Sequence, residues 1–254
     1  MRLLPKKKAT VVVPTYNEAE NIRLLLKEIN QVSESISGYE LNVLVVDDNS
    51  PDGTANLVKE LGMGNVHLLK RERKEGLGRA YIDGFGYAIR VLGSEVVIEM
   101  DADFSHDPGD LPRFLAELGK GFDLVVGSRH IVGGSIPEWG FHRKVVSYVG
   151  NLLAREVLGF DVSDCTSGYR AIRSSLLGEI NLEGINVKGY AFQLSLLHSA
   201  VVHKARIKEI PIVFRRRRAG KSKLGLGDIS EFLLELVKIK MRRFRQSPGV
   251  IRNP

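Results

Sequence analysis

Short apolar runs alternate with longer amphipathic segments along the first half of the chain. The runs have strand-like lengths and consist mostly of Val, Ile and Leu, a composition typical of a parallel sheet covered on both faces. They lie at 9–14, 41–47, 65–69, 95–100 and 123–127. Apolar residues spaced three and four apart predict helices between them, at 18–32, 52–61, 78–92 and 110–118. This alternation predicts an α/β fold with a doubly wound, mostly parallel sheet.

The second half of the chain has a different pattern. Helices are predicted at 143–159, 166–180 and 189–202, followed by a strand at 205–214 and a basic loop at 215–228. A final amphipathic helix is predicted to have an apolar side and a charged side. The apolar side is Ile229, Phe232, Leu233, Leu236 and Val237, and the charged side is Glu231, Glu235, Lys238, Arg242 and Arg245. We expect one domain over 1–227, with halves of about 1–130 and 131–227, and a basic helix and tail over 228–254.

The net charge of +7 is unevenly distributed. From Lys204 onward there are 15 Lys and Arg against 4 Asp and Glu, whereas the preceding residues have 22 against 26. Such a basic segment is either a solvated face or a surface for polyanions, which include nucleic acid, anionic lipid and phosphorylated substrates. The single cysteine, Cys165, excludes a disulfide framework and a Cys-based metal site.

The sequence predicts neither a secretory leader nor a spanning helix. The first apolar run is short and is followed by Pro14. The uncharged stretch 189–202 is shorter than the roughly 18 to 20 apolar residues that a spanning helix needs. We therefore expect a soluble or peripheral protein.

Three polar clusters, at 14–18, 47–53 and 101–106, follow predicted strands. Because parallel sheets bind ligands beyond the carboxyl ends of their strands, the clusters should share one rim. Asp101 and Asp103 could together bind a hard divalent cation that holds diphosphate oxygens, although an isolated D-x-D is more often a solvated turn.

The other two clusters favour a nucleotide site. Tyr16 could stack on a base and Asp48 could bond a ribose or a base edge. The chain contains neither a P-loop nor a dinucleotide fingerprint. No His, Cys or Ser arrangement indicates covalent catalysis, and we expect His106, beside the D-x-D, to be a structural hydrogen-bonding residue.

Eight ordered motifs between Thr10 and Lys223 resemble the polyprenol-phosphate (dolichol-phosphate) mannose synthases, inverting family 2 glycosyltransferases with the GT-A fold. The motifs read VVVPTYNEAENI, VVDDNSPDGT, GLGRAYIDGF, DADFSHDP, VVGSRHIVGG, TSGYRAIR, KGYAFQ and PIVFRRRRAGKSKL. The resemblance implies a GT-A, Rossmann-like fold and transfer of mannose from GDP-mannose to a polyprenyl (dolichyl) phosphate. It implies a β-linked product and Mg²⁺ or Mn²⁺ as the cofactor.

The resemblance also implies roles for single residues. The guanosine pocket would contain Pro14, Tyr16, Glu18, Val46 and Asp48. Asp101, Ala102 and Asp103 would form the metal and diphosphate motif, with Ser105, where relatives commonly have Gln, as a third metal ligand. The nucleotide sugar would also meet Arg129, Lys188, Arg217 and Lys223, and the acceptor phosphate would meet Arg129 and Arg143. Asp103, Arg129 and Arg217 would carry catalysis. Relatives often read F-V-D-R at 214–217, so Arg215 and Arg216 are alternatives to Arg217.

The chemistry of the implied acceptor agrees with the basic residues. A lipid monophosphate is already ionised at neutral pH, so it needs positive charge around two anions more than a strong general base. We expect peripheral binding at the cytoplasmic face of a membrane, through the helix after Asp228, the apolar part of GNLLAREVLGF and the basic loop, with or without a separate membrane subunit.

Two alternatives remain open from the sequence. A polyprenol-phosphate glucosyltransferase that uses UDP-glucose has similar motifs. A nucleic-acid-binding protein would account for the basic segment, but the chain has no reader motif, and we expect no nucleic-acid partner.

Overall fold

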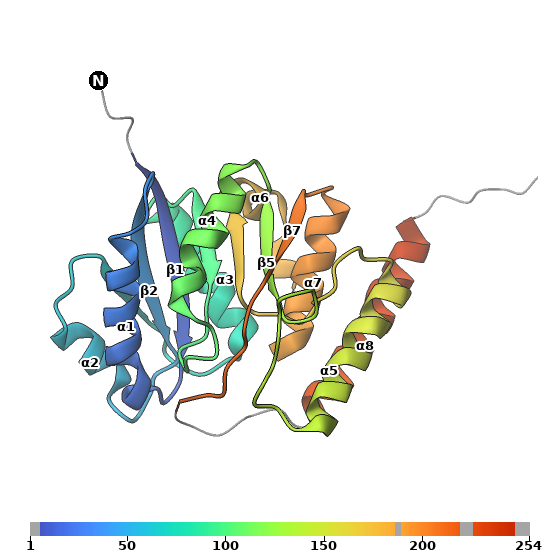
Figure 1. Cartoon of the computed structure of the whole chain (residues 1–254), viewed down its shortest axis with the longest axis horizontal. Helices are drawn as coiled ribbons and strands as arrows, with labels where there is room; N and C mark the ends of the chain where they lie inside the picture. Colours follow the sequence, from blue (N-terminus) through green and yellow to red (C-terminus); the bar gives the residue numbers. More distant parts are fainter. Residues whose placement is uncertain (1–5, 186–188, 219–225, 247–254) are drawn as a thin grey trace, which may run out of the picture.

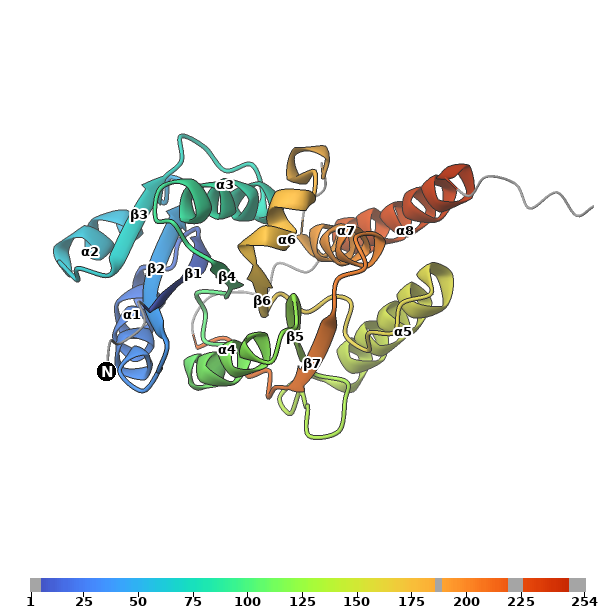
Figure 2. The same ribbon diagram turned by 90° about the horizontal axis from the view of Figure 1, so that it is seen from above.

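The computed structural model describes residues 6–185, 189–218 and 226–246. Its strands form one sheet in the order β3-β2-β1-β4-β6-β5-β7 (Figures 1 and 2). The strands are β1 (Lys7–Thr15), β2 (Tyr39–Asp47), β3 (Val66–Lys70), β4 (Val96–Glu99), β5 (Leu124–Ser128), β6 (Arg170–Arg173) and β7 (Ile207–Pro211). All neighbouring pairs are parallel except those of β6, which runs antiparallel to β4 and β5. The predicted mostly parallel α/β sheet is confirmed.

Helices cover both faces of the sheet (Figure 2). They are α1 (Ala19–Ser33), α2 (Thr54–Glu60), α3 (Leu77–Arg90), α4 (Leu111–Gly119), α5 (Phe141–Leu158), α6 (Ser174–Glu179), α7 (Gly189–Val202) and α8 (Leu226–Gln246), with short 3₁₀ turns η1 (Pro108–Asp110) and η2 (Leu182–Gly184). Along β1, Val11 and Val13 belong to the core under α1 and α4, whereas Val12 belongs to the core under α3 and α7. This two-sided burial explains why the strands are apolar at nearly every position.

The predicted helix at 166–180 is wrong in its first half, where the chain forms β6 and only 174–179 is helical. Arg170 is fully buried, and its guanidinium donates to the backbone oxygens of Gln193 and Cys165 at 2.7 and 2.8 Å. The bond to Gln193 and the pairing with β4 and β5 join segments far apart in the sequence, and they override the local helical pattern. The predicted strand at 205–214 is shorter than expected, although an isolated bridge joins Ser135 to Val213 beyond it.

The predicted apolar side of the last helix is wrong for Leu233 and Val237, which are 45% and 55% exposed. The helix instead buries Phe232, Leu236 and Ile239 against the protein. Glu235, expected on the charged side, is also buried, because its carboxylate accepts a 2.9 Å hydrogen bond from Ser195 Oγ of α7. The side chains of Ile229, Arg242 and Arg245 lie outside the described part. Within the described ranges, no helix is long and apolar enough to cross a bilayer.

Candidate active site

The three polar clusters lie at one edge of the sheet, where β1, β2 and β4 end. Thr15 at the end of β1 pairs with Asp47 at the end of β2, and Glu99 at the end of β4 pairs with Val12. Hydrogen bonds join the first two clusters: the Asn17 N–H donates to Ser50 Oγ and the Glu18 N–H to Thr54 Oγ1, both at 3.0 Å. The structure therefore brings together the segments that the sequence predicts to share a rim.

The D-x-D segment forms a tight turn directly after β4. The backbone N–H of Asp101 donates to His106 Nδ1 at 3.0 Å, which closes the turn. Asp103 is buried, and its Oδ1 accepts hydrogen bonds from the backbone N–H and the hydroxyl of Ser105. Phe104 between them has a positive φ of 67°, a strained backbone conformation for a residue with a side chain. The hydroxyl of Ser105, expected at the metal, thus bonds the Asp103 carboxylate in this structure.

The Asp101 carboxylate lies in an unfavourable electrostatic environment. Burial, followed by repulsion from Asp103, raises the pKa of Asp101 to about 7, although Arg217 acts in the opposite direction. The side chain of Asp101 is still 30% exposed, so its oxygens are open to a ligand. Two neighbouring carboxylates supply the hard oxygen donors that suit a divalent cation. Since no group of three His, Cys, Asp or Glu side chains among the described residues could hold a metal, two ligands would come from this turn and others from substrate or water.

A basic segment, residues 213–218, lies across the D-x-D turn. The Arg217 guanidinium forms an ion pair with Asp103, with 3.0 Å between Nη1 and Oδ2. The Arg215 and Arg218 backbone N–H groups donate to the Ser105 and Asp103 carbonyl oxygens at 3.2 and 3.0 Å. Arg217 thus pairs with a carboxylate of the turn and the Arg218 guanidinium lies 5.7 Å from the centre of the Phe104 ring, whereas Arg215 reaches Asp107 at 3.5 Å.

At the end of the rim formed by β1 and β2, Arg71 contacts three acidic residues. Its guanidinium contacts Asp48, Glu75 and Asp83 and is itself nearly buried. Burial raises the pKa of Asp48 even though the hydrogen bond from Arg71 lowers it. Lys74 of the same loop places its Nζ 3.8 Å from the centre of the Tyr16 ring. A base stacked on Tyr16 would therefore meet a site already lined by charged groups.

The other predicted pocket residues have structural contacts at this end of the rim. Glu18 precedes α1 and its carboxylate accepts a 2.8 Å hydrogen bond from the Asn21 side chain. Val46 and Ala102 are buried, and Pro14 is partly buried near the end of β1. Val46 and Ala102 thus belong to the hydrophobic core in this structure.

Arg129, expected at the diphosphate or the acceptor, lies in a buried ion pair. Its Nε and Nη2 donate to the two Asp164 carboxylate oxygens at 2.7 Å each, and Nη2 also reaches Thr166 Oγ1 at 2.8 Å. Burial would raise the pKa of Asp164, but the charge and hydrogen bonds of Arg129 outweigh it and lower the pKa to about 2. Arg129 is only 6% exposed, so it is fixed to Asp164 rather than extended toward solvent.

Aromatic side chains connect Arg143 to the basic segment. The Arg143 guanidinium lies 3.8 Å from the centre of the Trp139 ring, and Trp139 meets Phe214 edge-on at 5.5 Å. Arg143 is half-buried at the beginning of α5. The structure thus places a cation on an aromatic platform beside the basic segment.

Several residues that contact the candidate site were not identified from the sequence. Arg71, Lys74, Trp139 and Asp164 lie beside predicted site residues but outside recognised motifs, and only their packing reveals them. Trp139 gave one signal, since it is the single Trp of the chain. The predicted ligands Lys188 and Lys223 lie outside the described residues.

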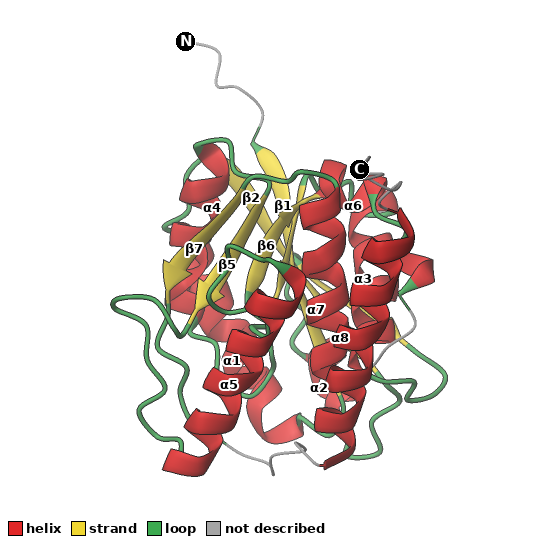
Figure 3. Ribbon diagram, turned by 90° about the vertical axis from the view of Figure 1, so that its right-hand side faces the viewer, coloured by secondary structure: helices red, strands yellow, loops and turns green. Residues whose placement is uncertain are grey.

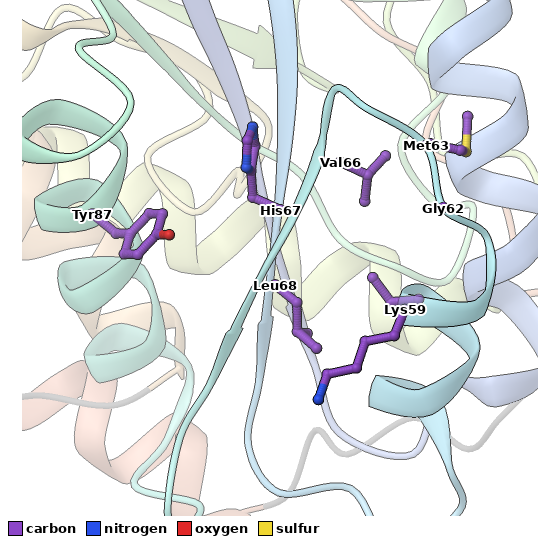
Figure 4. Close-up of a pocket in the computed structure, with 8 residues that line it drawn as sticks. Lys59, Gly62, Met63, Val66, His67, Leu68 and Tyr87 are labelled. Atoms are coloured by element: carbon purple, nitrogen blue, oxygen red, sulfur yellow. The ribbon is translucent and has the colours of Figure 1, made fainter.

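A separate depression of about 310 Å³ lies away from this rim (Figure 4). Lys59, Met63, His67, Leu68 and Tyr87 are among its lining residues. It flanks the first residues of β3, whereas the rim lies at the opposite ends of the strands. None of the predicted site residues lines it, so we assign it no part in the chemistry.

Comparison with known proteins identifies relatives over almost the whole chain. Residues 10–180 match the model of the family described as Glycosyl transferase family 2. The polyprenol monophosphomannose synthase of Mycolicibacterium smegmatis is 38% identical over 98% of this chain and 93% of its own length. The undecaprenyl-phosphate mannosyltransferase of Micrococcus luteus is 41% identical over 89% of this chain and 91% of its own.

Solved structures share the fold at lower identity. Glucosyl-3-phosphoglycerate synthase from Mycobacterium tuberculosis, in complex with Mn²⁺ and UDP-glucose, superposes with a TM-score of 0.67 at 19% identity, covering 96% of this chain and 81% of that one. Mannosyl-3-phosphoglycerate synthase from Rubrobacter xylanophilus superposes with a TM-score of 0.67 at 20% identity, covering 97% of this chain and 77% of that one. These likenesses establish the fold.

Proposed function

The chain belongs to glycosyl transferase family 2, and from that premise we propose that it moves mannose from GDP-mannose to the phosphate of a polyprenyl lipid, with inversion to a β-linked mannosyl phosphate. The observation that carries the proposal is the similarity over most of the chain to two relatives whose names state mannosyl transfer to polyprenyl lipids. Those names do not state the donor. GDP-mannose as the donor follows from the motif resemblance, and it is the part most in need of a test.

The donor diphosphate is proposed to lie at the D-x-D turn. Asp101 and Asp103 would hold Mg²⁺ or Mn²⁺ there, and this ion would supply positive charge for the departing GDP. Arg217 lies against Asp103 and can move its guanidinium a short distance onto a diphosphate oxygen, because its side chain is 31% exposed. Tyr16 and Asp48 are proposed to bind the guanosine, with Arg71 holding the Asp48 carboxylate in place.

The acceptor phosphate is proposed to enter from the Arg143 side. It is ionised at neutral pH and needs no side chain to remove a proton before it attacks the anomeric carbon. Arg143 is the candidate for its first contact, and the buried Arg129–Asp164 pair is proposed to support the wall behind it. The chain would thus work mainly by orienting two anions and balancing their charge.

A lipid acceptor requires contact with a membrane, and one surface has the chemistry for it. Helices α5 and α8 lie side by side (Figures 1 and 3), and the Lys240 ammonium of α8 donates to the Val157 carbonyl of α5 at 2.9 Å. We call their outward side chains the α5–α8 apolar surface, each at least 41% exposed: Val145, Val146, Tyr148, Val149, Leu152, Leu153, Leu233, Leu234, Val237 and Met241.

Such an exposed apolar area is typical of an interaction surface. Lys144 and Lys238 are exposed on the same two helices, and basic residues flanking apolar ones favour an anionic bilayer. We infer peripheral binding through this surface at the cytoplasmic face of a membrane, where a separate membrane subunit could also attach.

Product analysis tests the proposed donor. The protein is incubated with a polyprenyl phosphate and equal concentrations of GDP-mannose and UDP-glucose, with Mn²⁺ present, and the lipid product is identified by mass spectrometry. GDP-mannose and UDP-glucose add hexoses of equal mass, so the GDP-mannose carries ¹³C in its sugar. A lipid product that carries only the labelled hexose supports the proposal. A lipid product that carries only unlabelled hexose would transfer the reaction to the UDP-glucose alternative.

A further inference from the structure

His106 has contacts that exceed those of an ordinary core residue. It is 1% exposed, and its ring stacks on Tyr169 with 4.7 Å between centroids and 21° between planes. The Tyr169 hydroxyl donates to the Asp107 carbonyl at 2.9 Å, so the chain on the far side of His106 is attached to the same aromatic ring. The imidazole is therefore held in one orientation.

That orientation directs Nδ1 at the backbone of the D-x-D turn. The Met100 N–H is the last in this strand to bond β1, through the Val12 carbonyl at 3.2 Å. The next amide, that of Asp101, donates instead to His106 Nδ1 at 3.0 Å. An acceptor at Nδ1 requires the neutral imidazole with its proton on Nε2. The imidazole thus replaces the strand partner where the chain leaves the sheet.

The opposite side of the ring contacts the basic segment. Phe214 meets His106 edge-on, with 5.5 Å between centroids and 76° between planes. Phe214 precedes by three residues Arg217, the partner of Asp103. The same imidazole consequently touches the turn that bears both aspartates and the segment that bears the arginine.

We propose that His106 is a positioning residue for the donor diphosphate and its cation. By accepting a hydrogen bond from the Asp101 N–H, it fixes the direction in which the Asp101 carboxylate leaves the turn. The inference rests on the proposed function, because it assumes that this turn binds a cation and a nucleoside diphosphate.

Two substitutions separate the contribution of the hydrogen-bond acceptor Nδ1 from that of the stacked ring. His106→Phe keeps an aromatic ring between Tyr169 and Phe214 but removes the acceptor, leaving the Asp101 N–H unpaired. His106→Asn places an amide oxygen near the position of Nδ1 but removes the stacking. If the role of His106 is purely structural, the affinity for GDP with Mn²⁺ should follow the stability of each variant, and His106→Asn should bind more weakly than His106→Phe. The positioning role predicts the opposite order for binding.

The measurement is the dissociation constant of GDP with Mn²⁺, obtained by calorimetry, together with the thermal midpoint of each protein in EDTA. We expect His106→Phe to bind GDP with Mn²⁺ about tenfold more weakly, the effect of an unpaired buried amide. His106→Asn should bind within about threefold of the wild type while unfolding at a lower temperature. If His106→Phe is insoluble, His106→Gln replaces it. The Gln amide reaches the position of Nε2 rather than that of Nδ1, so this variant should bind GDP with Mn²⁺ as weakly as His106→Phe.

The outcomes distinguish this inference from the proposed function. Wild-type protein that binds no GDP with Mn²⁺ would contradict the proposed function itself. Wild-type binding matched by His106→Phe, or binding that falls in the order of the thermal midpoints, would overturn the role of His106 alone.

Discussion

The Arg217 guanidinium of the basic segment forms an ion pair with the Asp103 carboxylate of the D-x-D turn, with 3.0 Å between Nη1 and Oδ2. Asp103 is 3% exposed in its side chain and Arg217 31%, so the carboxylate is fixed and the guanidinium can change partner. A diphosphate that approaches the turn would meet both the cation ligands and an arginine already beside them. This relationship places a positive and a negative side chain where the diphosphate leaving group of a glycosyl donor would need charge balance.

Removing the Arg217 side chain should therefore affect turnover far more than folding. We expect Arg217→Ala to lower kcat/KM for GDP-mannose by about 10²-fold, the usual effect of losing one donor to a developing anion. The thermal midpoint should change little, because the side chain is partly exposed. Steady-state kinetics and thermal unfolding measure the two effects.

Arg216→Ala is the matched control, since Arg216 is exposed and its backbone N–H donates to Glu138. It should retain most of the activity. Equal losses in the two variants would mean that the overall positive charge matters rather than the contact with Asp103.

Asp103→Asn tests the charge of the turn without removing its shape. The amide oxygen can still accept from the Ser105 N–H, so the turn should persist, but one anionic oxygen donor is lost. We expect a fall in kcat of about 10²- to 10³-fold, measured as nucleoside diphosphate release. Asp107→Asn is the control, because either side chain can accept from the Gly109 N–H that caps η1. Full activity of Asp103→Asn would refute the assignment.

The Arg129–Asp164 pair predicts a specific pH dependence of stability. The carboxyl pKa of Asp164 is about 2 in the folded protein against an ordinary value of 3.8. A carboxyl group whose pKa is lowered in the folded state stabilises the fold at pH values above its ordinary pKa. That stabilisation is lost as the pH falls toward 2. The excess unfolding free energy of wild type over Asp164→Asn should thus shrink by about 1 kcal/mol between pH 7 and pH 3. Urea unfolding at both pH values measures it, and a pH-independent difference would contradict the pairing.

The α5–α8 apolar surface is predicted to bind vesicles, and one added negative charge on each helix should abolish that binding. Val149→Asp combined with Leu234→Asp adds a charge to each helix at positions that are 44% and 60% exposed. We expect the double variant to lose flotation with anionic vesicles, yet to release GDP normally with a water-soluble short-chain acceptor. Val91→Asp, 62% exposed at the end of α3, should float like the wild type. Unchanged flotation of the double variant would exclude this surface as the docking site.

Regular patterns made much of the fold predictable, and long-range contacts account for the errors. Val11, Val12 and Val13 are buried from both sides, so their run signals a covered parallel strand. Arg170 gives no such signal, because its strand depends on bonds to Gln193 and Cys165. Likewise the orientation of α8 depends on Glu235 meeting Ser195, which helical periodicity cannot anticipate.

The candidate site was predictable to the extent that it lies in contiguous motifs. Asp101 and Asp103 were predicted as site residues because they follow a buried strand and share a rim with two other polar clusters. Arg71 was not found, since its significance is the buried contact with Asp48 from another strand end. His106 was recognised as a hydrogen-bonding residue, but its bond to the Asp101 amide required the folded turn.

The central claim is metal-assisted mannosyl transfer to a lipid phosphate at the D-x-D turn. The most direct test is GDP release from GDP-mannose, with and without a polyprenyl phosphate, in Mn²⁺ and in EDTA. The account predicts release that requires both the lipid phosphate and the metal. Release that continues undiminished in EDTA, or that ignores the lipid, would contradict it.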